Sequence, residues 1–134
     1  MKRTFLLNSG LSLIISELGH TEALCIADCG LPVPSGVRRV DLALSPGIPS
    51  FLETLRAALS EMCVERALFA EELKRNSAFL DAASALIKKE NPKAVIEFAP
   101  HEAFKKQCSA ARAVIRSGEQ TPYANVLLYS GVTF

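Results

Sequence analysis

The chain has 134 residues, of which 49% are apolar and 22% charged, and a formal net charge of +1. This composition is typical of one globular domain, spanning residues 1–134, and its basic side chains are too scattered among acidic ones to favour a nucleic-acid partner. The apolar run over 11–18 contains Glu17 and is too short to cross a bilayer, and we expect no secretory leader. We therefore expect no membrane partner and a cytoplasmic location.

The first predicted element is a helix. Asn8-Ser9 offers an N-cap, the apolar residues of 11–18 fall on one helical face, and Gly19 ends the helix. The apolar run over 23–27 then predicts a buried strand. The following segment, 30–36, contains two prolines, so it is expected to be neither a helix nor a central strand.

The middle of the chain predicts two strands and a helix. A short strand is expected over 39–44. Ser50 and Glu53 have the spacing of a capping box and start a helix. The segment 64–70 is ambiguous, and we interpret it as a strand followed by a helical turn over 71–74.

The last third of the chain alternates between helices and strands. An apolar stripe predicts a helix over 77–90, which Asn-Pro ends. A strand over 94–99, a helix over 100–112 that Pro starts, and strands over 114–116 and 126–129 follow.

The alternation of strands and helices predicts an α/β fold, a three-layer α/β/α domain with a mainly parallel sheet. Ligand sites in such sheets lie beyond the carboxyl ends of the strands. Asp28, His101 and the loop of Tyr123 follow or flank predicted strands, so we expect them to converge at one edge.

Several cofactor and catalytic motifs are missing. The chain has no phosphate-binding G-x-x-x-x-G-K-[ST], no dinucleotide-binding G-x-G-x-x-G, no G-x-S-x-G and no H-E-x-x-H. The sequence therefore lacks the usual motifs for binding a nucleotide cofactor and for zinc-dependent proteolysis. The four cysteines, Cys25, Cys29, Cys63 and Cys108, have neither zinc-ribbon nor thioredoxin spacing. We expect reduced thiols, although a reactive Cys29 stays open beside the favoured interpretation of inert packing.

Only two histidines exist, His20 and His101, and both fall at element boundaries. Histidine titrates near neutral pH, so it can give and take a proton within one turnover. The alternative, that each simply lies at a helix end, is equally compatible with position alone.

The other candidates have ordinary alternatives as well. Asp28 can accept hydrogen bonds from a polyol, but a turn is the favoured interpretation. Lys105 is four residues from His101 on one helix, yet a solvated helical face is favoured. Tyr123 and Asn125 offer an aromatic ring and an amide to a sugar, or simply a turn in which Asn tolerates a left-handed backbone.

These segments together resemble the ribose and fucose mutarotase family, and within it the D-ribose pyranases. The likeness runs essentially from end to end, and its motifs are long and ordered. The matching motifs are Leu-Gly-His-Thr-Glu (18–22), Asp-Cys-Gly-Leu-Pro-Val-Pro (28–34), Pro-Ser-Phe (49–51), His-Glu-Ala-Phe-Lys (101–105), Ala-Val-Ile-Arg-Ser-Gly-Glu (113–119), Pro-Tyr-Ala-Asn (122–125) and Gly-Val-Thr-Phe (131–134). The loop over 30–34 separates the chain from the fucose mutarotases.

The resemblance implies an isomerase that interconverts pyranose and furanose forms of D-ribose in carbohydrate metabolism, with neither cofactor nor metal. It places the catalytic proton transfer on His20. The substrate-binding residues that it implies are Asp28, His101, Lys105, Tyr123, Ala124 and Asn125. Cys29 and Glu22 depart from the family pattern, which has alanine and aspartate there, but neither belongs to this set.

The resemblance also implies a homo-oligomer: pentameric rings stacked as a decamer, with sites at subunit boundaries. The tail over 126–134 is apolar enough to be buried against a neighbour or to be a core strand. Three rival functions stay open. They are a mutarotase of another aldose, such as fucose or a uronate, a sugar-binding or transport-regulatory module without catalysis, and a purely structural ring.

Overall fold

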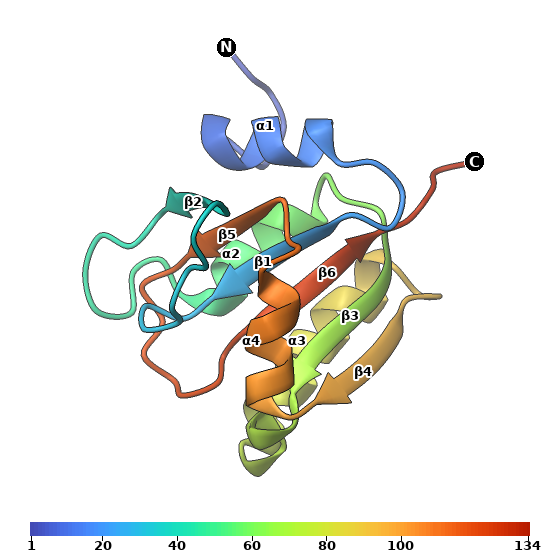
Figure 1. Cartoon of the computed structure of the whole chain (residues 1–134). Helices are drawn as coiled ribbons and strands as arrows, with labels where there is room; N and C mark the ends of the chain where they lie inside the picture. Colours follow the sequence, from blue (N-terminus) through green and yellow to red (C-terminus); the bar gives the residue numbers. More distant parts are fainter.

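One six-stranded sheet organises the molecule. The computed structural model describes all residues, 1–134 (Figure 1). The strands are β1 (Ala23–Ala27), β2 (Arg38–Asp41), β3 (Val64–Ala70), β4 (Val95–Ala99), β5 (Ala113–Arg116) and β6 (Val126–Ser130). Their order across the sheet is β2-β5-β1-β6-β3-β4.

Five of the six strands run in the same direction. β1 pairs with β5, β5 with β2 and β3 with β4 in parallel, whereas β6 is antiparallel to both of its neighbours, β1 and β3. The carboxyl ends of β1 to β5 therefore share one edge with the amino end of β6. This mostly parallel sheet confirms the predicted α/β class.

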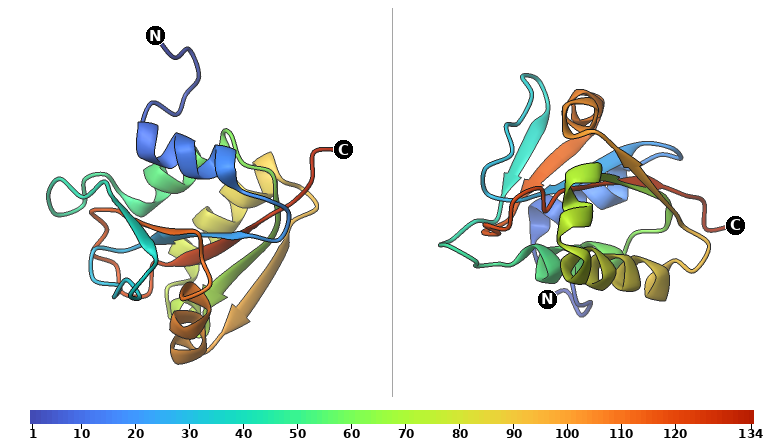
Figure 2. Two further views of the ribbon diagram at one scale, coloured as in Figure 1. Left: turned by 45° about the horizontal axis from the view of Figure 1, so that its top comes forward. Right: turned by 90° about the horizontal axis from the view of Figure 1, so that it is seen from below.

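Helices cover the two faces of the sheet. They are α1 (Ser9–Glu17), α2 (Phe51–Leu59), α3 (Ser77–Glu90) and α4 (His101–Cys108), with a short 3₁₀ helix, η1 (Glu71–Arg75). The larger apolar cluster joins one face to α1, α2 and α3, and the smaller one joins the other face to α4. Figure 2 shows α4 on its own side of the sheet. The predicted three layers are confirmed.

Local sequence signals account for most of the element boundaries. Ser50 and Glu53 form the predicted capping box of α2, and the Asn8 side chain accepts a hydrogen bond from the Leu11 N–H at 2.9 Å. The ambiguous segment is a strand followed by η1, as predicted.

Two predicted elements are shorter than expected because tertiary contacts redirect the chain. α4 ends at Cys108 rather than near residue 112, where the Arg112 N–H already donates to the Ala23 carbonyl at 2.8 Å and joins the sheet. β2 ends at Asp41: the Leu42 N–H still donates to the Arg116 carbonyl at 2.9 Å, but the Leu44 N–H then donates to the Ile48 carbonyl at 2.9 Å, outside the sheet.

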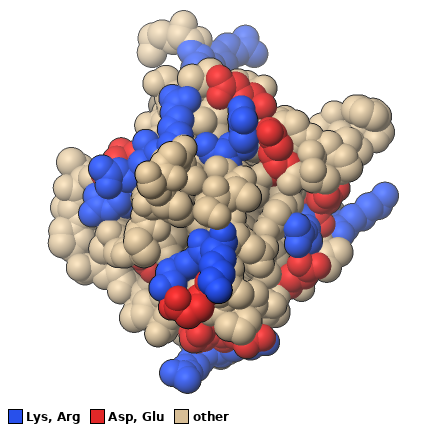
Figure 3. Space-filling view, in the orientation of Figure 1, with Lys and Arg blue, Asp and Glu red and all other residues tan.

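The surface and the helices agree with the composition. Lys and Arg are interspersed with Asp and Glu on the face drawn in Figure 3, without a basic stripe. None of the helices combines the length and the apolar character that crossing a membrane requires.

Candidate active site

A polar pocket of about 380 Å³ lies at the carboxyl edge of the parallel strands. Its size is in the range usual for small-molecule sites. The lining residues come from the loops that follow β1 and β5 and from the start of α4: Asp28, Cys29, Gly30, Leu31, Pro32, His101, Glu119, Gln120, Pro122, Tyr123 and Asn125. Four of the predicted site residues, Asp28, His101, Tyr123 and Asn125, are therefore brought together.

Asp28 and Asn125 form a reciprocal pair at the floor of the pocket. The Asp28 N–H donates to Asn125 Oδ1, and Asn125 Nδ2 donates to Asp28 Oδ2, each at 2.9 Å. Asp28 Oδ1 also accepts from the Gly30 N–H at 2.9 Å. Asn125 is 1% exposed, so it acts by holding the carboxylate in place. The remaining lone pairs of that carboxylate can accept hydrogen bonds from a ligand's hydroxyl groups.

His101 begins α4 and forms one wall of the pocket. Its backbone N–H donates to both Glu72 carboxylate oxygens, at 3.0 and 3.2 Å. The N–H of Glu72 itself, and after it that of His101, hold the pKa of Glu72 below its ordinary value. This carboxylate from η1 therefore anchors the start of α4.

The His101 ring is fixed by its neighbours. It lies edge-on to Tyr123, with ring centroids 5.0 Å apart, and stacks on Phe104 at 6.3 Å. Its Nδ1 is buried without a hydrogen-bond partner, so Nε2 is the ring nitrogen that remains for a ligand. Unpaired buried polar atoms are uncommon in native structures, so the unpaired Nδ1 distinguishes His101 from the other residues that line the pocket.

The loop before β6 places Tyr123 through an unusual backbone conformation. Tyr123 itself has a φ of 64°, so the left-handed residue of this turn is the tyrosine and not Asn125, to which the alternative turn interpretation gave that conformation. The Ala124 side chain is fully buried in the larger apolar cluster. Ala124 therefore offers a ligand at most its backbone.

Lys105 does not line the pocket. Its ammonium group is paired with Glu102, one turn earlier on α4, at 2.6 Å. Within one chain this is the solvated helical face that the spacing favoured, and the structure does not bring Lys105 together with His101 in the cavity.

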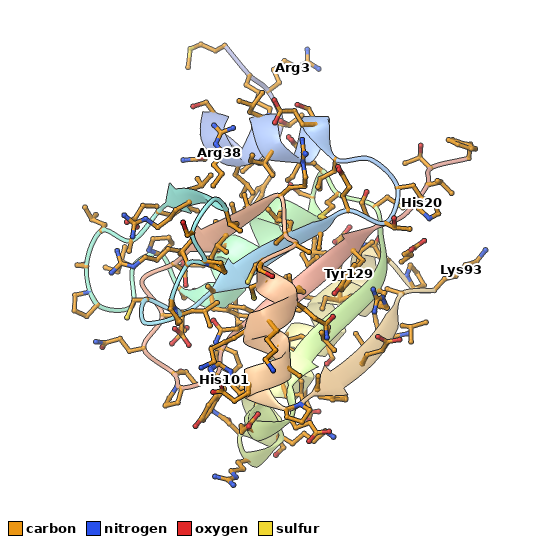
Figure 4. The ribbon with its side chains drawn as sticks, in the orientation of Figure 1. Arg3, His20, Arg38, Lys93, His101 and Tyr129 are labelled. Atoms are coloured by element: carbon orange, nitrogen blue, oxygen red, sulfur yellow. The ribbon has the colours of Figure 1, made fainter.

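His20 lies at the opposite edge of the sheet (Figure 4). It precedes β1, whereas Asp28 follows it, and the five residues of β1 alone span about 16 Å. His20 borders a second cavity of about 400 Å³, lined chiefly by apolar residues of the α1 end and the C-terminal tail. A single chain therefore cannot bring His20 and Asp28 to one pentose.

The loop that carries His20 is tightly held. Glu22 Oε2 accepts from the Gly19 N–H at 2.8 Å, and the Thr21 N–H donates to the Ser130 carbonyl at 2.9 Å. Thr21 has a φ of 68°, a conformation that costs a β-branched residue about 1–3 kcal/mol. The strained conformation of Thr21 lies next to His20, which is exposed at the surface.

Known proteins resemble this chain over its whole length. The sequence pattern described as the RbsD / FucU transport protein family matches residues 1–133. The chain belongs to the RbsD/FucU family. The D-ribose pyranase of Laribacter hongkongensis is 52% identical over 134 residues, and that of Pasteurella multocida is 48% identical over 139 residues. Both matches cover 100% of each chain.

Two solved structures share the fold. The structure of Bacillus subtilis RbsD complexed with D-ribose has a TM-score of 0.90 and 44% sequence identity to this chain, with 100% of both chains covered. The fucose mutarotase of Streptococcus pneumoniae in complex with L-fucose has a TM-score of 0.83 at 21% identity. The second comparison supports the fold alone.

The two departures from the RbsD/FucU pattern lie closer to the candidate residues than the sequence suggested. Cys29 lines the pocket beside Asp28, and its carbonyl accepts from Arg116 Nε at 3.0 Å. Glu22 holds the loop of His20. Arg116 is also paired with Asp41 at 3.1 Å.

Sequence reasoning missed Glu119, which also lines the pocket. One carboxylate oxygen accepts from the Thr121 hydroxyl at 2.8 Å and the Gln120 and Thr121 N–H groups at 3.0 Å, and the other from the Phe51 N–H at 3.3 Å. Burial acts in the opposite direction, yet these donors hold the pKa of Glu119 below its ordinary value. Glu119 thereby ties the pocket loop to the start of α2.

Proposed function

We propose that this chain interconverts the pyranose and furanose ring forms of D-ribose, the activity named in its full-length relatives. The observation that carries the proposal is the 52% identity over the whole chain to a D-ribose pyranase. The polar pocket of Asp28, His101, Tyr123 and Asn125 supports it, because these groups suit a neutral polyol.

The reaction needs proton transfer and orientation. Opening the pyranose delivers a proton to the ring oxygen, removes one from the anomeric hydroxyl and breaks the bond between the anomeric carbon and the ring oxygen, which leaves an aldehyde. A different hydroxyl then adds to that carbon, losing its own proton while the aldehyde oxygen gains one. No electrons are transferred, so one residue that exchanges protons suffices.

We assign proton transfer to His20 and hydroxyl orientation to the pocket. The Asp28 carboxylate, held by Asn125, accepts from sugar hydroxyls, and His101 and Tyr123 flank the sugar. Fixing which hydroxyl faces the aldehyde selects the ring that forms. In this proposal Lys105 contributes only a positive charge near the sugar, and Ala124 contributes only a backbone contact to it.

We further propose that the complete site lies between two copies of the chain. His20 of the partner subunit would reach the pocket that contains Asp28, because the two residues lie at opposite ends of β1 in one chain. Apolar side chains are exposed near both edges, among them Val132 and Phe134 beside His20, and Leu44 and Ile48 by the loops around Gly118. Their burial between copies would favour a closed ring, and pentameric rings stacked as a decamer remain the proposed assembly.

The substrate assignment is tested by ring-exchange NMR on a panel of sugars. We expect the protein to accelerate exchange between the anomeric signals of ribopyranose and ribofuranose, and to accelerate ribose more than fucose. Acceleration of fucose without ribose would instead make the chain a mutarotase of another aldose. Saturable ribose binding without any acceleration would favour a sugar-binding module.

The proposed compartment is the cytoplasm. All four cysteines are free thiols, and Cys25 Sγ and Cys108 Sγ lie 3.8 Å apart in the interior without a disulfide. Thiols in this arrangement suit a reducing compartment.

A further inference from the structure

Glu65 is the side chain in direct contact with His20. His20 Nε2 and Glu65 Oε2 are 2.8 Å apart, the distance of a charge-assisted hydrogen bond. Glu65 belongs to β3, which is separated from β1 by β6, so the contact joins segments 45 positions apart in the chain. Glu65 lies outside all of the sequence motifs that indicated the site.

An irregularity in the sheet directs Glu65 toward His20. Val64 pairs with Ser130 and Arg66 with Tyr129, so β3 advances two residues where β6 advances one. Glu65 is the extra residue of this β-bulge. Bulges re-aim a side chain and are enriched beside active sites.

The neighbouring tail leaves room for this arrangement. A Cβ on Gly131 would lie 3.2 Å from Glu65 Cβ and 3.3 Å from Glu65 N, a tight approach. The Gly131 N–H also donates to the Cys63 carbonyl at 3.0 Å, which holds the tail against the start of β3. Glycine at 131 therefore lets the end of β6 pass close to the bulge.

The contact determines which ring nitrogen of His20 is free. A carboxylate only accepts hydrogen bonds, so Nε2 carries the hydrogen in the neutral ring. Nδ1 is then the nitrogen with a lone pair for proton transfer. When Nδ1 takes a proton, the positive ring lies against the Glu65 carboxylate.

From this geometry we infer that Glu65 is a positioning residue for His20, which it holds in one orientation and one tautomer for proton transfer to the sugar. The inference rests on the proposed function, since it needs His20 to be the proton-transfer residue. In one chain the His20 and Glu65 side chains are 51% and 42% exposed, and exposed pairs of this kind contribute little stability. The role of Glu65 is therefore in the rate rather than in folding.

The test compares Glu65→Ala and Glu65→Gln with Glu97→Ala as a matched control. Glu97 is a partly exposed glutamate on β4 that pairs with Arg66 at 3.0 Å and does not contact His20. Steady-state ribose ring exchange gives kcat and KM, and ¹⁵N NMR reports the tautomer of the two histidines, with His20→Ala identifying the His20 signals. The glutamine variant preserves the side-chain shape in case the alanine variant folds poorly.

We expect Glu65→Ala to lower kcat about 10- to 100-fold with KM nearly unchanged, less than the roughly 10²- to 10⁴-fold contribution of a proton-transfer group itself. The His20 ring should change from one fixed tautomer to an average of two. Glu65→Gln should lose part of the rate, and Glu97→Ala should match the wild type.

The outcomes separate the two proposals. If His20→Ala is inactive but both Glu65 variants retain wild-type kcat, or if they raise KM alone, the role of Glu65 is wrong and the proposed function stands. If His20→Ala keeps full ring exchange, the assignment of His20 itself fails.

Discussion

Replacing His20 with alanine should slow ribose ring exchange by about 10²- to 10⁴-fold, the contribution of a positioned proton-transfer group. Ribose affinity should change little, because the hydroxyl-orienting groups lie in the pocket of Asp28 and not beside His20. Saturation-transfer NMR between the anomeric signals measures the rate, and calorimetry measures the affinity.

The exposed Lys89 on α3 supplies the control for this substitution. Its side chain is 75% exposed and has only a distant ion pair at 3.9 Å, so Lys89→Ala should retain the wild-type rate. A His20→Ala protein with an unchanged exchange rate would favour a sugar-binding module without catalysis.

Asp28→Asn should act in the opposite way and weaken ribose binding. The substitution preserves shape but replaces a charged acceptor with an amide, which costs about 1.5–3 kcal/mol where a hydrogen bond to a charged group is lost. The dissociation constant for ribose should therefore rise roughly 10- to 100-fold. At saturating ribose, kcat should fall much less than it does in the His20 variant.

Asp81→Asn is the matched control, because Asp81 is exposed on α3 away from the pocket. Calorimetric titration with ribose compares the two variants, and a melting curve verifies that each is folded. Wild-type affinity in Asp28→Asn would mean that the pocket does not bind the sugar.

The convergence of Asp28, His101 and the Tyr123 loop could be predicted because local patterns mark the ends of strands. In a mostly parallel sheet, carboxyl ends share one edge, and the apolar runs before Asp28 and His101 locate two of those ends. The capping box of α2 is equally local. Such features depend on neighbours a few residues away, which the sequence displays directly.

The direction of β6 could not be predicted from its own residues. Its run of apolar residues suits either direction, and long-range pairing with β1 and β3 decides the matter. Because β6 runs against its neighbours, the loop with Tyr123 precedes it at the pocket edge. The bulge that exposes Glu65 likewise arises from pairing between distant strands.

The position of His20 relative to Asp28 could be predicted from the sequence. One residue precedes β1 and the other follows it, so the two must lie at opposite edges of the sheet. A site formed by one chain would require both residues at the same edge. In the proposed mechanism, a second copy of the chain therefore supplies one of the two residues.

A mixing experiment tests this shared site most directly. His20→Ala and Asp28→Asn chains carry different affinity tags, are produced together, and are purified through both tags. The ring-exchange rate is then measured at ribose concentrations well below the dissociation constant of the Asp28 variant. Each variant purified alone should be nearly inactive under these conditions.

In mixed assemblies, random association gives roughly a quarter of the subunit boundaries both a native His20 and a native Asp28. We predict recovery of about that fraction of the wild-type rate. A rate no greater than the sum of the two variants measured separately would contradict the shared site, because boundaries that contain both native residues would then have no activity.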